Sequence, residues 1–420
     1  MKKEAYPAVT KHELYRLLRN IGPILKGESP IDLERLRLEG GSREAIENFL
    51  CSYGISLEDI AKVDRIKAEA IEFIQTHLLK DEELEIPEEI RSPQTNIYSL
   101  LQMATSPPRR KDGNLQQKWA CALLRVMHTI YHLEDDIRFK YIHHIQEKIL
   151  AKIKRYIQYD EGGQMYLGQK GNDIIPLVAL DLKRIKERES IIVKLLHKRE
   201  NIVTEITDVV GVRLIAKSKL DALKIVNFLV KENILSYPNS IPGRTKNTLM
   251  PLDELEKVLK RGDKKQLGGY FRLLEEGVVI VDKSKNDNPH SVDYRAMNFT
   301  SREKIEIENP EYQTQFKLLQ ELEKQHKDLV QKVDAAPPIH RELISYHKKV
   351  IQNIKGSLSR MSRYISFYYP FEIQIMDREA YEQYQKSYPR YKENQRRTAR
   401  RRVLKSLLLE SNLYRNNMAS

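Results

Sequence analysis

The first 160 residues space their apolar side chains at the intervals of amphipathic helices. Segments such as LYRLLRNIG, AIENFLCSYG and IKAEAIEFIQTHLL repeat apolar positions three and four residues apart, which places them on one face of a helix. Gly22 and Gly54 follow two of these segments and are expected to end helices. A longer helix is expected from about 115 to 156. Residues 1–160 therefore predict an all-helical N-terminal region.

Beyond a glycine-containing boundary at 161–171, apolar runs typical of strands alternate with helical patterns. The runs from Ile174 to Leu182 and from Val209 to Ile215 are separated by a stretch with helical apolar spacing, and an amphipathic helix is expected at 219–231. Two further strands are expected, at 294–300 and 364–376. This half of the chain therefore mixes strands with helices.

Two segments of helical character interrupt that alternation. The first, 249–276, predicts helices broken at Gly268 and Gly269, with a short strand following at 278–281. The second predicts a long helical hairpin, with one helix at 311–333 and another running to about 358. The expected organisation is a helical region, 1–160, and a second domain, 161–420, with insertions near 249–290 and 302–362 and a basic C-terminal tail.

Net charge adds a class of partner to this picture. The 420 residues carry a formal charge of +13, which favours a polyanionic partner such as a nucleotide or RNA; the alternative is a charge that serves only solubility. The two cysteines, Cys51 and Cys121, argue against a disulfide framework or a cysteine-built zinc site. No apolar run approaches the roughly 20 residues that span a bilayer, and the N-terminus lacks an apolar signal segment. We expect a cytoplasmic protein without membrane contact.

Candidate chemistry concentrates between 173 and 215. The first apolar run ends in Lys183, Arg184 and Lys186, and Asp208 stands at the head of the second run. Two strand ends joined by a helix would bring these cations and this carboxylate into one cleft, which suits a metal-bound nucleoside triphosphate.

Two other features allow more than one interpretation. His128 and His132 are one helical turn apart and could share a metal, but the chain has neither an HExxH pattern nor a His-Asp dipeptide, so we favour a structural or solvated role. The tail from 388 to 405 is strongly basic and contains tyrosines. It could contact RNA, including tRNA, or pack as a solvated helix on acidic parts of the chain.

Four short motifs occur in a fixed order: RIKERESIIVK at 184–194, TDVVGVRLI at 207–215, DYRAM at 293–297 and FEIQI at 371–375. Together they resemble the synthetase domain of the RelA/SpoT family, which makes the alarmone (p)ppGpp, over roughly 174–376. The resemblance implies an α+β fold of the nucleotidyltransferase type, with a mixed β-sheet flanked by helices. It also implies that the β,γ-pyrophosphate of Mg-ATP is transferred to the ribose 3′-hydroxyl of GDP or GTP.

The resemblance assigns roles by position. Asp208 and Glu372 resemble the family's catalytic carboxylates that bind Mg²⁺, and Tyr294 resembles the tyrosine that stacks on the guanine of the acceptor. The candidates for binding ATP are Arg184, Lys186, Lys194 and Arg213. The further candidates for binding the guanosine nucleotide acceptor are Arg244, Arg295, Asn298 and Gln374. These residue types suit pyrophosphoryl transfer, which needs positioning and charge neutralisation more than covalent help.

The motifs depart from the family pattern on the acceptor side. Asp293 replaces the usual glycine before the tyrosine, Asn298 replaces a histidine, and Met376 follows the FEIQI motif where a polar residue is usual. Two alternatives therefore remain beside the nucleotide acceptor: the same transfer onto the 3′ end of tRNA, or a nucleotide-sensing or scaffold domain without turnover. Residues 1–160 show no recognisable hydrolase motif, so no alarmone hydrolysis is expected.

Overall fold

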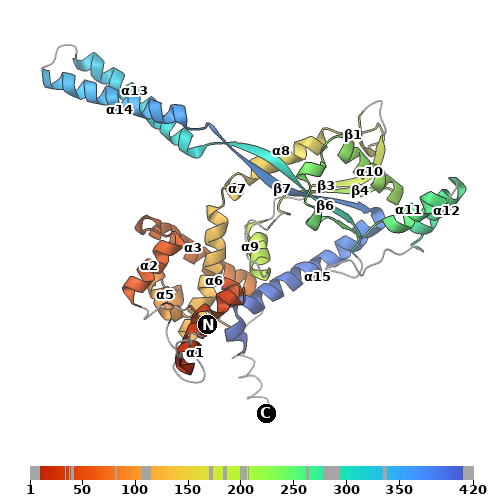
Figure 1. The fold of residues 1–420 in the computed structure, drawn as a ribbon, viewed down its shortest axis with the longest axis horizontal. Coiled ribbons are helices and arrows are strands. Elements are labelled where there is room, and N and C mark those ends of the chain that lie inside the picture. The colour runs from red at the N-terminus through yellow and green to blue at the C-terminus, as the bar shows by residue number, and fades with distance from the viewer. Residues whose placement is uncertain are drawn as a thin grey trace, which may run out of the picture.

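The structure is a computed structural model of the chain. It describes residues 10–33, 35–36, 38, 42–80, 83–105, 115–169, 174–182, 187–198, 206, 208–261, 264–277, 294–333 and 338–409. The fold is α+β, with an N-terminal helical region followed by a mixed sheet flanked by helices (Figure 1). This confirms the fold class expected from the sequence.

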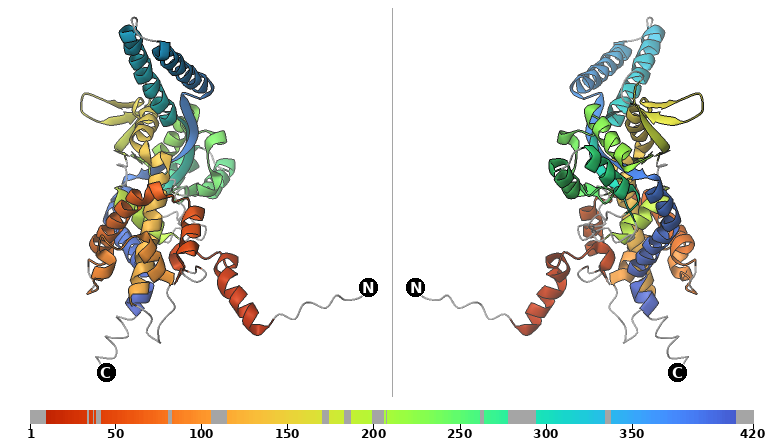
Figure 2. Two further views of the ribbon diagram at one scale, coloured as in Figure 1. Left: turned by 90° about the vertical axis from the view of Figure 1, so that its left-hand side faces the viewer. Right: turned by 90° about the vertical axis from the view of Figure 1, so that its right-hand side faces the viewer.

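Up to Lys154, the described residues of the N-terminal region form helices joined by turns and loops, with no strand. Its elements are α1 (Lys11–Leu25), η1 (Pro30–Asp32), α2 (Arg43–Tyr53), η3 (Leu57–Asp59), α3 (Ile60–Phe73), η4 (Ile74–Leu78), α4 (Glu88–Arg91), α5 (Ile97–Thr105), α6 (Leu115–Asp135), α7 (Ile137–Lys140) and α8 (Ile142–Lys154). Figure 2 shows α1, in red, standing apart from the other helices. Its leucines at 14, 17, 18 and 25 are all exposed.

Of three local expectations in this region, one is confirmed and two are wrong. Gly54 does end α2, because it adopts the left-handed conformation (φ 85°) that glycine tolerates best. The expectation for Gly22 is wrong, since α1 continues to Leu25. The single helix expected at 115–156 is also wrong. It breaks at Asp136, whose side chain accepts a hydrogen bond from the backbone of Arg138 and so starts a new helix.

The sheet has seven strands in the order β1-β2-β3-β4-β7-β6-β5. The β4–β7 pair is parallel and the other pairs are antiparallel. The strands are β1 (Ile157–Tyr159), β2 (Met165–Leu167), β3 (Ile175–Leu182), β4 (Gly211–Ala216), β5 (Lys246–Asn247), β6 (Met297–Glu308) and β7 (Tyr364–Asp377). All residues of β4 are buried, as expected of a central strand that is covered on both faces.

Helices flank this sheet and extend from it. They are α9 (Arg188–His197), α10 (Lys219–Lys231), α11 (Leu252–Arg261), α12 (Lys264–Glu275), α13 (Pro310–Val333), α14 (Pro338–Arg360) and α15 (Arg378–Val403), with short 3₁₀ turns η6 (Tyr237–Asn239) and η7 (Pro242–Arg244). The amphipathic helix expected at 219–231 is α10. The glycine break is wrong, because Gly268 and Gly269 lie inside α12. The strand expected at 278–281 lies outside the described residues.

The expected helical hairpin is present as α13 and α14. It stands at the end of a long ribbon formed by β6 and β7, which pair from Met297 opposite Ile375 to Glu308 opposite Tyr364. Figure 1 shows this arm extending away from the sheet. The strand expected at 294–300 is therefore displaced: it begins at Met297 and continues into the segment that the sequence assigns to an insertion.

Helix α15 connects the sheet to the N-terminal helices. It leaves the end of β7 and runs back across the molecule (Figure 1). Near its C-terminal end, Arg402 contacts both carboxylate oxygens of Asp32 at 2.7 and 2.8 Å. The same guanidinium donates to the carbonyls of Leu196 and Lys198 at the end of α9, at 2.8 and 2.5 Å. Part of the basic tail is thus a helix that is tied to both regions.

No helix within the described ranges combines the length and the apolar character needed to cross a bilayer.

Candidate functional site

A row of polar side chains crosses the middle of the sheet. Asp181 on β3 is opposite Arg213 on β4, Arg213 is beside Gln374 on β7, and Gln374 is opposite Asn298 on β6. Residues in register on neighbouring strands point to the same face and contact each other. The strand pairing therefore assembles a polar surface from four segments that are far apart in the sequence.

Arg213 is the centre of this row and is only 4% exposed. It forms an ion pair with Asp181, and its Nε donates to Gln374 Oε1 at 3.0 Å. Its guanidinium carbon lies 4.1 Å from the centre of the Tyr384 ring, a cation–π distance. Burial would lower the pKa of Arg213, but the neighbouring Tyr384 and Asp181 raise it above its ordinary value. Arg213 is thus a fixed, permanent cation.

Two carboxylates come to the same part of the sheet. Glu372 on β7 is opposite Gly211, the first residue of β4, and its backbone N–H donates to the carbonyl of Val210 at 3.0 Å. Asp208 lies just before this point of β4. Glu372 also precedes Gln374 by two positions, and alternate residues of a strand point to one face. Both carboxylates therefore adjoin the polar row.

Helix α9 supplies a cation to this group. The Lys194 ammonium forms an ion pair with Asp208, and the two side chains are 13% and 24% exposed. At the other end of α9, Arg188 contacts Glu69 of α3 at 2.6 Å and Glu134 of α6 at 3.2 Å. These contacts fix α9, and with it Lys194, against the N-terminal helices.

Tyr294 closes the group on the side of β6. Its hydroxyl donates to Asn298 Oδ1 at 3.3 Å, and its ring meets that of Tyr384 edge-on, with centres 6.1 Å apart. Burial, and then the nearby Glu372 carboxylate, raise the pKa of Tyr294 above its ordinary range. Tyr294 is therefore a neutral hydrogen-bond donor at physiological pH.

These side chains line one cavity of about 1030 Å³. The predicted site residues that it brings together are Lys194, Asp208, Arg213, Tyr294, Asn298, Glu372 and Gln374. Arg244, in η7, and Arg295 were also expected at the site, but neither is among its lining residues. Arg244 lies in η7, far in sequence from any lining residue, and Arg295 directly follows the lining residue Tyr294. Arg184 and Lys186 lie outside the described residues.

One wall of the cavity is formed by α15, whose residues from 388 onward were expected to form a basic tail that could contact RNA but were not expected at this site. Helix α15 lines it with tyrosines 381, 384, 388 and 391 and with Lys392 and Arg396. The tyrosine ring centres follow one another at 6.5, 5.1 and 6.3 Å. Their spacing of three or four residues was the available signal, because such residues share a helix face. The sequence also did not identify Asp181, because its contact with Arg213 depends on the pairing of β3 with β4.

The donor set at the cavity suits Mg²⁺. This ion prefers oxygen ligands and is commonly held by one or two carboxylates together with substrate phosphates; Asp208 and Glu372 could supply those carboxylates. The described residues contain no cluster of three or more histidine, cysteine or acidic side chains arranged for a metal. His128 and His132, the other metal candidates, both contact the hydroxyl of Tyr53.

No protein-family model matches the chain, and no curated protein is significantly similar to it. What the cavity binds must therefore be inferred from its own side chains and their contacts.

Proposed function

We propose that this cavity is the active site of a pyrophosphokinase. It would transfer the β,γ-pyrophosphate of Mg-ATP to the 3′-hydroxyl of GDP or GTP, yielding a (p)ppGpp-type nucleotide. The observation that carries this proposal is the convergence of residues from all four sequence motifs on one cavity, with cations, carboxylates and tyrosines together. At about 1030 Å³, the cavity is at the upper end of the volumes typical of ligand sites, which suits two nucleotides.

The cationic side chains of the cavity would bind the triphosphate of the donor, ATP. Lys194 on α9 and Arg213 on β4 line the cavity, and so do Lys392 and Arg396 on α15. A triphosphate between them would be neutralised from two directions, which is the main requirement for transfer of a phosphoryl-type group. The fixed position of Arg213 means that little reorganisation is needed when charge develops on the phosphates.

The carboxylates account for the metal. Asp208 and Glu372 would hold Mg²⁺, and the ion would neutralise negative charge on the phosphates. Lys194, the present partner of Asp208, would then be available to contact phosphate. This exchange of partners keeps every charge compensated.

Tyr294 and the polar row account for the acceptor. A tyrosine face can stack on a purine, a contact worth about 1–3 kcal/mol, and the amides of Asn298 and Gln374 can hydrogen-bond to base or ribose. The 3′-oxygen attacks the β-phosphorus, the bond from that phosphorus to the bridging oxygen of the α-phosphate breaks, and AMP leaves. Glu372, within the same wall, would accept the proton of the 3′-hydroxyl.

The test is transfer of label from γ-labelled ATP with Mg²⁺ to GDP, GTP or tRNA offered in parallel. Asp208→Asn keeps the size of the side chain and should reduce transfer by at least about 100-fold. Asp135→Asn is the matched control, because Asp135 pairs with Lys62 away from the cavity; its activity should equal that of the unmodified chain.

Label in GDP or GTP that depends on Asp208 supports the proposal. Binding of ATP or GTP at the cavity without transfer to any acceptor would refute it and leave a nucleotide sensor as the better description. Equal activity of the Asp208→Asn and Asp135→Asn variants would refute the assignment of the site.

The same transfer onto the 3′ end of tRNA is a second candidate, favoured by the α15 wall. Aromatic side chains in a row beside cations are typical of surfaces that bind single-stranded nucleic acid, and here Tyr388, Tyr391, Lys392 and Arg396 line the cavity itself. Label in tRNA, weakened by salt and by Lys392→Ala with Arg396→Ala, would identify tRNA as the acceptor in place of GDP or GTP.

A further inference from the structure

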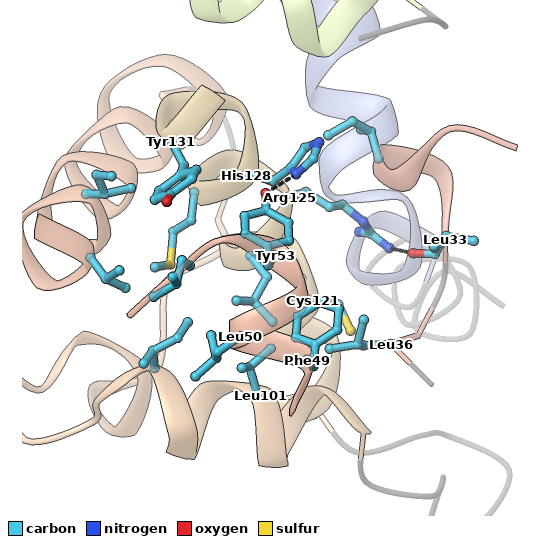
Figure 3. A pocket seen from close by; sticks show the side chains of 17 residues that line it. Leu33, Leu36, Phe49, Leu50, Tyr53, Leu101, Cys121, Arg125, His128 and Tyr131 are labelled. Carbon is cyan, nitrogen blue, oxygen red and sulfur yellow. Dashed lines mark hydrogen bonds between the residues drawn. The ribbon is translucent and has the colours of Figure 1, made fainter. Parts of the chain in front are cut away.

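A second cavity lies among the N-terminal helices, away from the sheet (Figure 3). Its volume is about 320 Å³. Helices α2, α3, α5 and α6 and the segment following η1 supply its walls, with side chains such as Phe49, Leu50, Val63 and Leu101. Apart from Tyr53, Tyr131, His128, Cys121 and Arg125, every lining residue is aliphatic, methionine or phenylalanine.

The size and lining define a class of ligand. An apolar cavity of about 150 Å³ is known to stay dry and to bind benzene, so a cavity of twice that volume suits about a dozen carbon atoms. Walls that face empty space lose their van der Waals contacts, and a protein keeps such a space most readily when a ligand fills it. The interior therefore matches a single aliphatic chain.

One side chain, that of Arg125, would fix the orientation of the ligand in the cavity. Arg125 is the only charged residue among the described lining residues, because burial, with a smaller effect from His132, lowers the pKa of His128 to about 4 and leaves it neutral. Figure 3 shows Arg125 at the edge of the cavity, with its guanidinium directed toward Leu33. A carboxylate head group at that edge would pair with the guanidinium while its chain lies among the apolar walls.

Arg125 also connects the cavity to α15. Its guanidinium donates to the carbonyl of Leu33 and, at 2.6 Å, to the carbonyl of Val403 near the end of α15. Leu33 follows Asp32, the residue that holds Arg402. The wall of the apolar cavity and the end of the helix that lines the larger cavity are therefore held by the same two arginines.

We propose that this cavity binds one saturated acyl chain of about twelve carbons with its carboxylate at Arg125, and that occupation stiffens α15. The proposal does not depend on the reaction proposed above, because its readouts are binding and hydrogen exchange. The ligand proposed is thus a free fatty acid; a single-chain lysolipid has the same acyl chain but no free carboxylate, and the probes below distinguish the two.

The binding test uses the full chain with dodecanoate, dodecanol and a dodecanoyl lysophosphatidylcholine in isothermal titration calorimetry. We expect one dodecanoate per chain and at least tenfold weaker binding of dodecanol, which has no carboxylate. Binding of the lysolipid as tight as that of dodecanoate would show that a free carboxylate is not recognised and would overturn the proposed fatty acid. Equal affinity for dodecanol and dodecanoate would overturn the role of Arg125.

Two variants fill the cavity from different walls. Leu124→Phe on α6 and Val63→Phe on α3 should each weaken dodecanoate binding at least tenfold, because the added atoms occupy the space of the chain. Leu25→Phe is the matched control: it places the same added volume on α1, where Leu25 is 71% exposed and outside the cavity. Circular dichroism confirms that each variant is folded.

If both filled variants bind as tightly as the control, the ligand does not enter this cavity and the proposal is wrong. Absence of one-to-one binding to the unmodified chain has the same meaning. For the coupling, hydrogen exchange of α15 should slow several-fold with dodecanoate bound, while the hairpin α13–α14 serves as the unaffected reference. Unchanged exchange of α15 in the saturated protein would overturn the coupling.

Discussion

The cavity at the sheet and the cavity among the N-terminal helices are built from opposite kinds of side chain. The larger one, at the sheet, contains the Lys194–Asp208 and Arg213–Asp181 ion pairs together with amides and tyrosines. The smaller one is lined by aliphatic and aromatic groups that also belong to the main hydrophobic cluster. Partly buried ion pairs often stabilise a protein less than apolar side chains of the same volume, whereas apolar burial is the main stabilising contribution to folding.

The contrast suggests a division of roles between the two cavities, one serving binding and the other stability. Groups in the polar cavity are retained for what they bind, and groups around the apolar cavity hold the helices together. Substitutions in the polar cavity should therefore change activity more than stability, and substitutions around the apolar cavity should do the reverse. The following experiments can contradict or refine this division.

The largest effect is expected when Lys194→Met and Asp208→Leu are combined. Removing both charges together avoids leaving either ion of this pair buried without the other, so the melting temperature should change little. Pyrophosphate transfer should fall by at least about 1000-fold, because both a phosphate contact and a metal ligand are lost. Differential scanning calorimetry and the label-transfer assay measure the two quantities. A large drop in melting temperature with pyrophosphate transfer retained would contradict this division of roles.

Arg125→Ala should lower the free energy of unfolding by about 3–5 kcal/mol. It removes two charge-assisted hydrogen bonds to the carbonyls of Leu33 and Val403 and leaves both without that donor. Arg43→Ala is the matched control, because Arg43 is exposed, forms a surface ion pair with Glu47 and lies 5.8 Å from the centre of the Tyr98 ring, and it should unfold nearly like the unmodified chain. Urea titration measures both, and equal stability of the two variants would contradict the prediction.

Acid should weaken the apolar region through His128. The pKa of His128 is lowered to about 4 from an ordinary 6.5, so between these values the unfolded chain binds a proton that the folded chain does not. Stability is fully present above about pH 6.5 and is lost as pH falls toward 4, by up to about 3 kcal/mol. The His128→Asn variant should lack this part of the slope in urea titrations at pH 7.5, 6 and 5. Parallel slopes for the two proteins would argue against a buried neutral histidine.

The smallest effect is expected at Tyr384. Burial raises the pKa of Tyr384 to about 12, although Arg213 acts in the opposite direction, so the ring remains neutral beneath the Arg213 guanidinium. Tyr384→Leu removes the cation–π contact and should weaken nucleotide binding by about 1 kcal/mol. Tyr384→Phe keeps the ring and should bind nearly as the unmodified chain does, as measured by calorimetry. If phenylalanine is as harmful as leucine, the hydroxyl matters more than the ring.

Local patterns predicted much of the fold. Amphipathic spacing placed α10 and the hairpin α13–α14, and the β-branched run after Asp208 placed β4. Expectations failed where the deciding contact is specific to one residue, as at Asp136, or where a glycine is tolerated inside a helix, as at 268 and 269. The short strands β1 and β2 went unpredicted, because three residues are too few to show a period.

By itself, the sequence determined the kinds of element, the cationic character and seven of the residues that line the polar cavity, since all of these depend on local spacing and side-chain chemistry. Only the tertiary structure determined which side chains contact each other. Asp181 meets Arg213 only through strand register, and the tyrosines of α15 reach the cavity only because the helix turns back across the sheet. The apolar cavity and its link to Val403 likewise require contacts between residues 278 positions apart, and such long-range packing leaves no periodic trace along the chain.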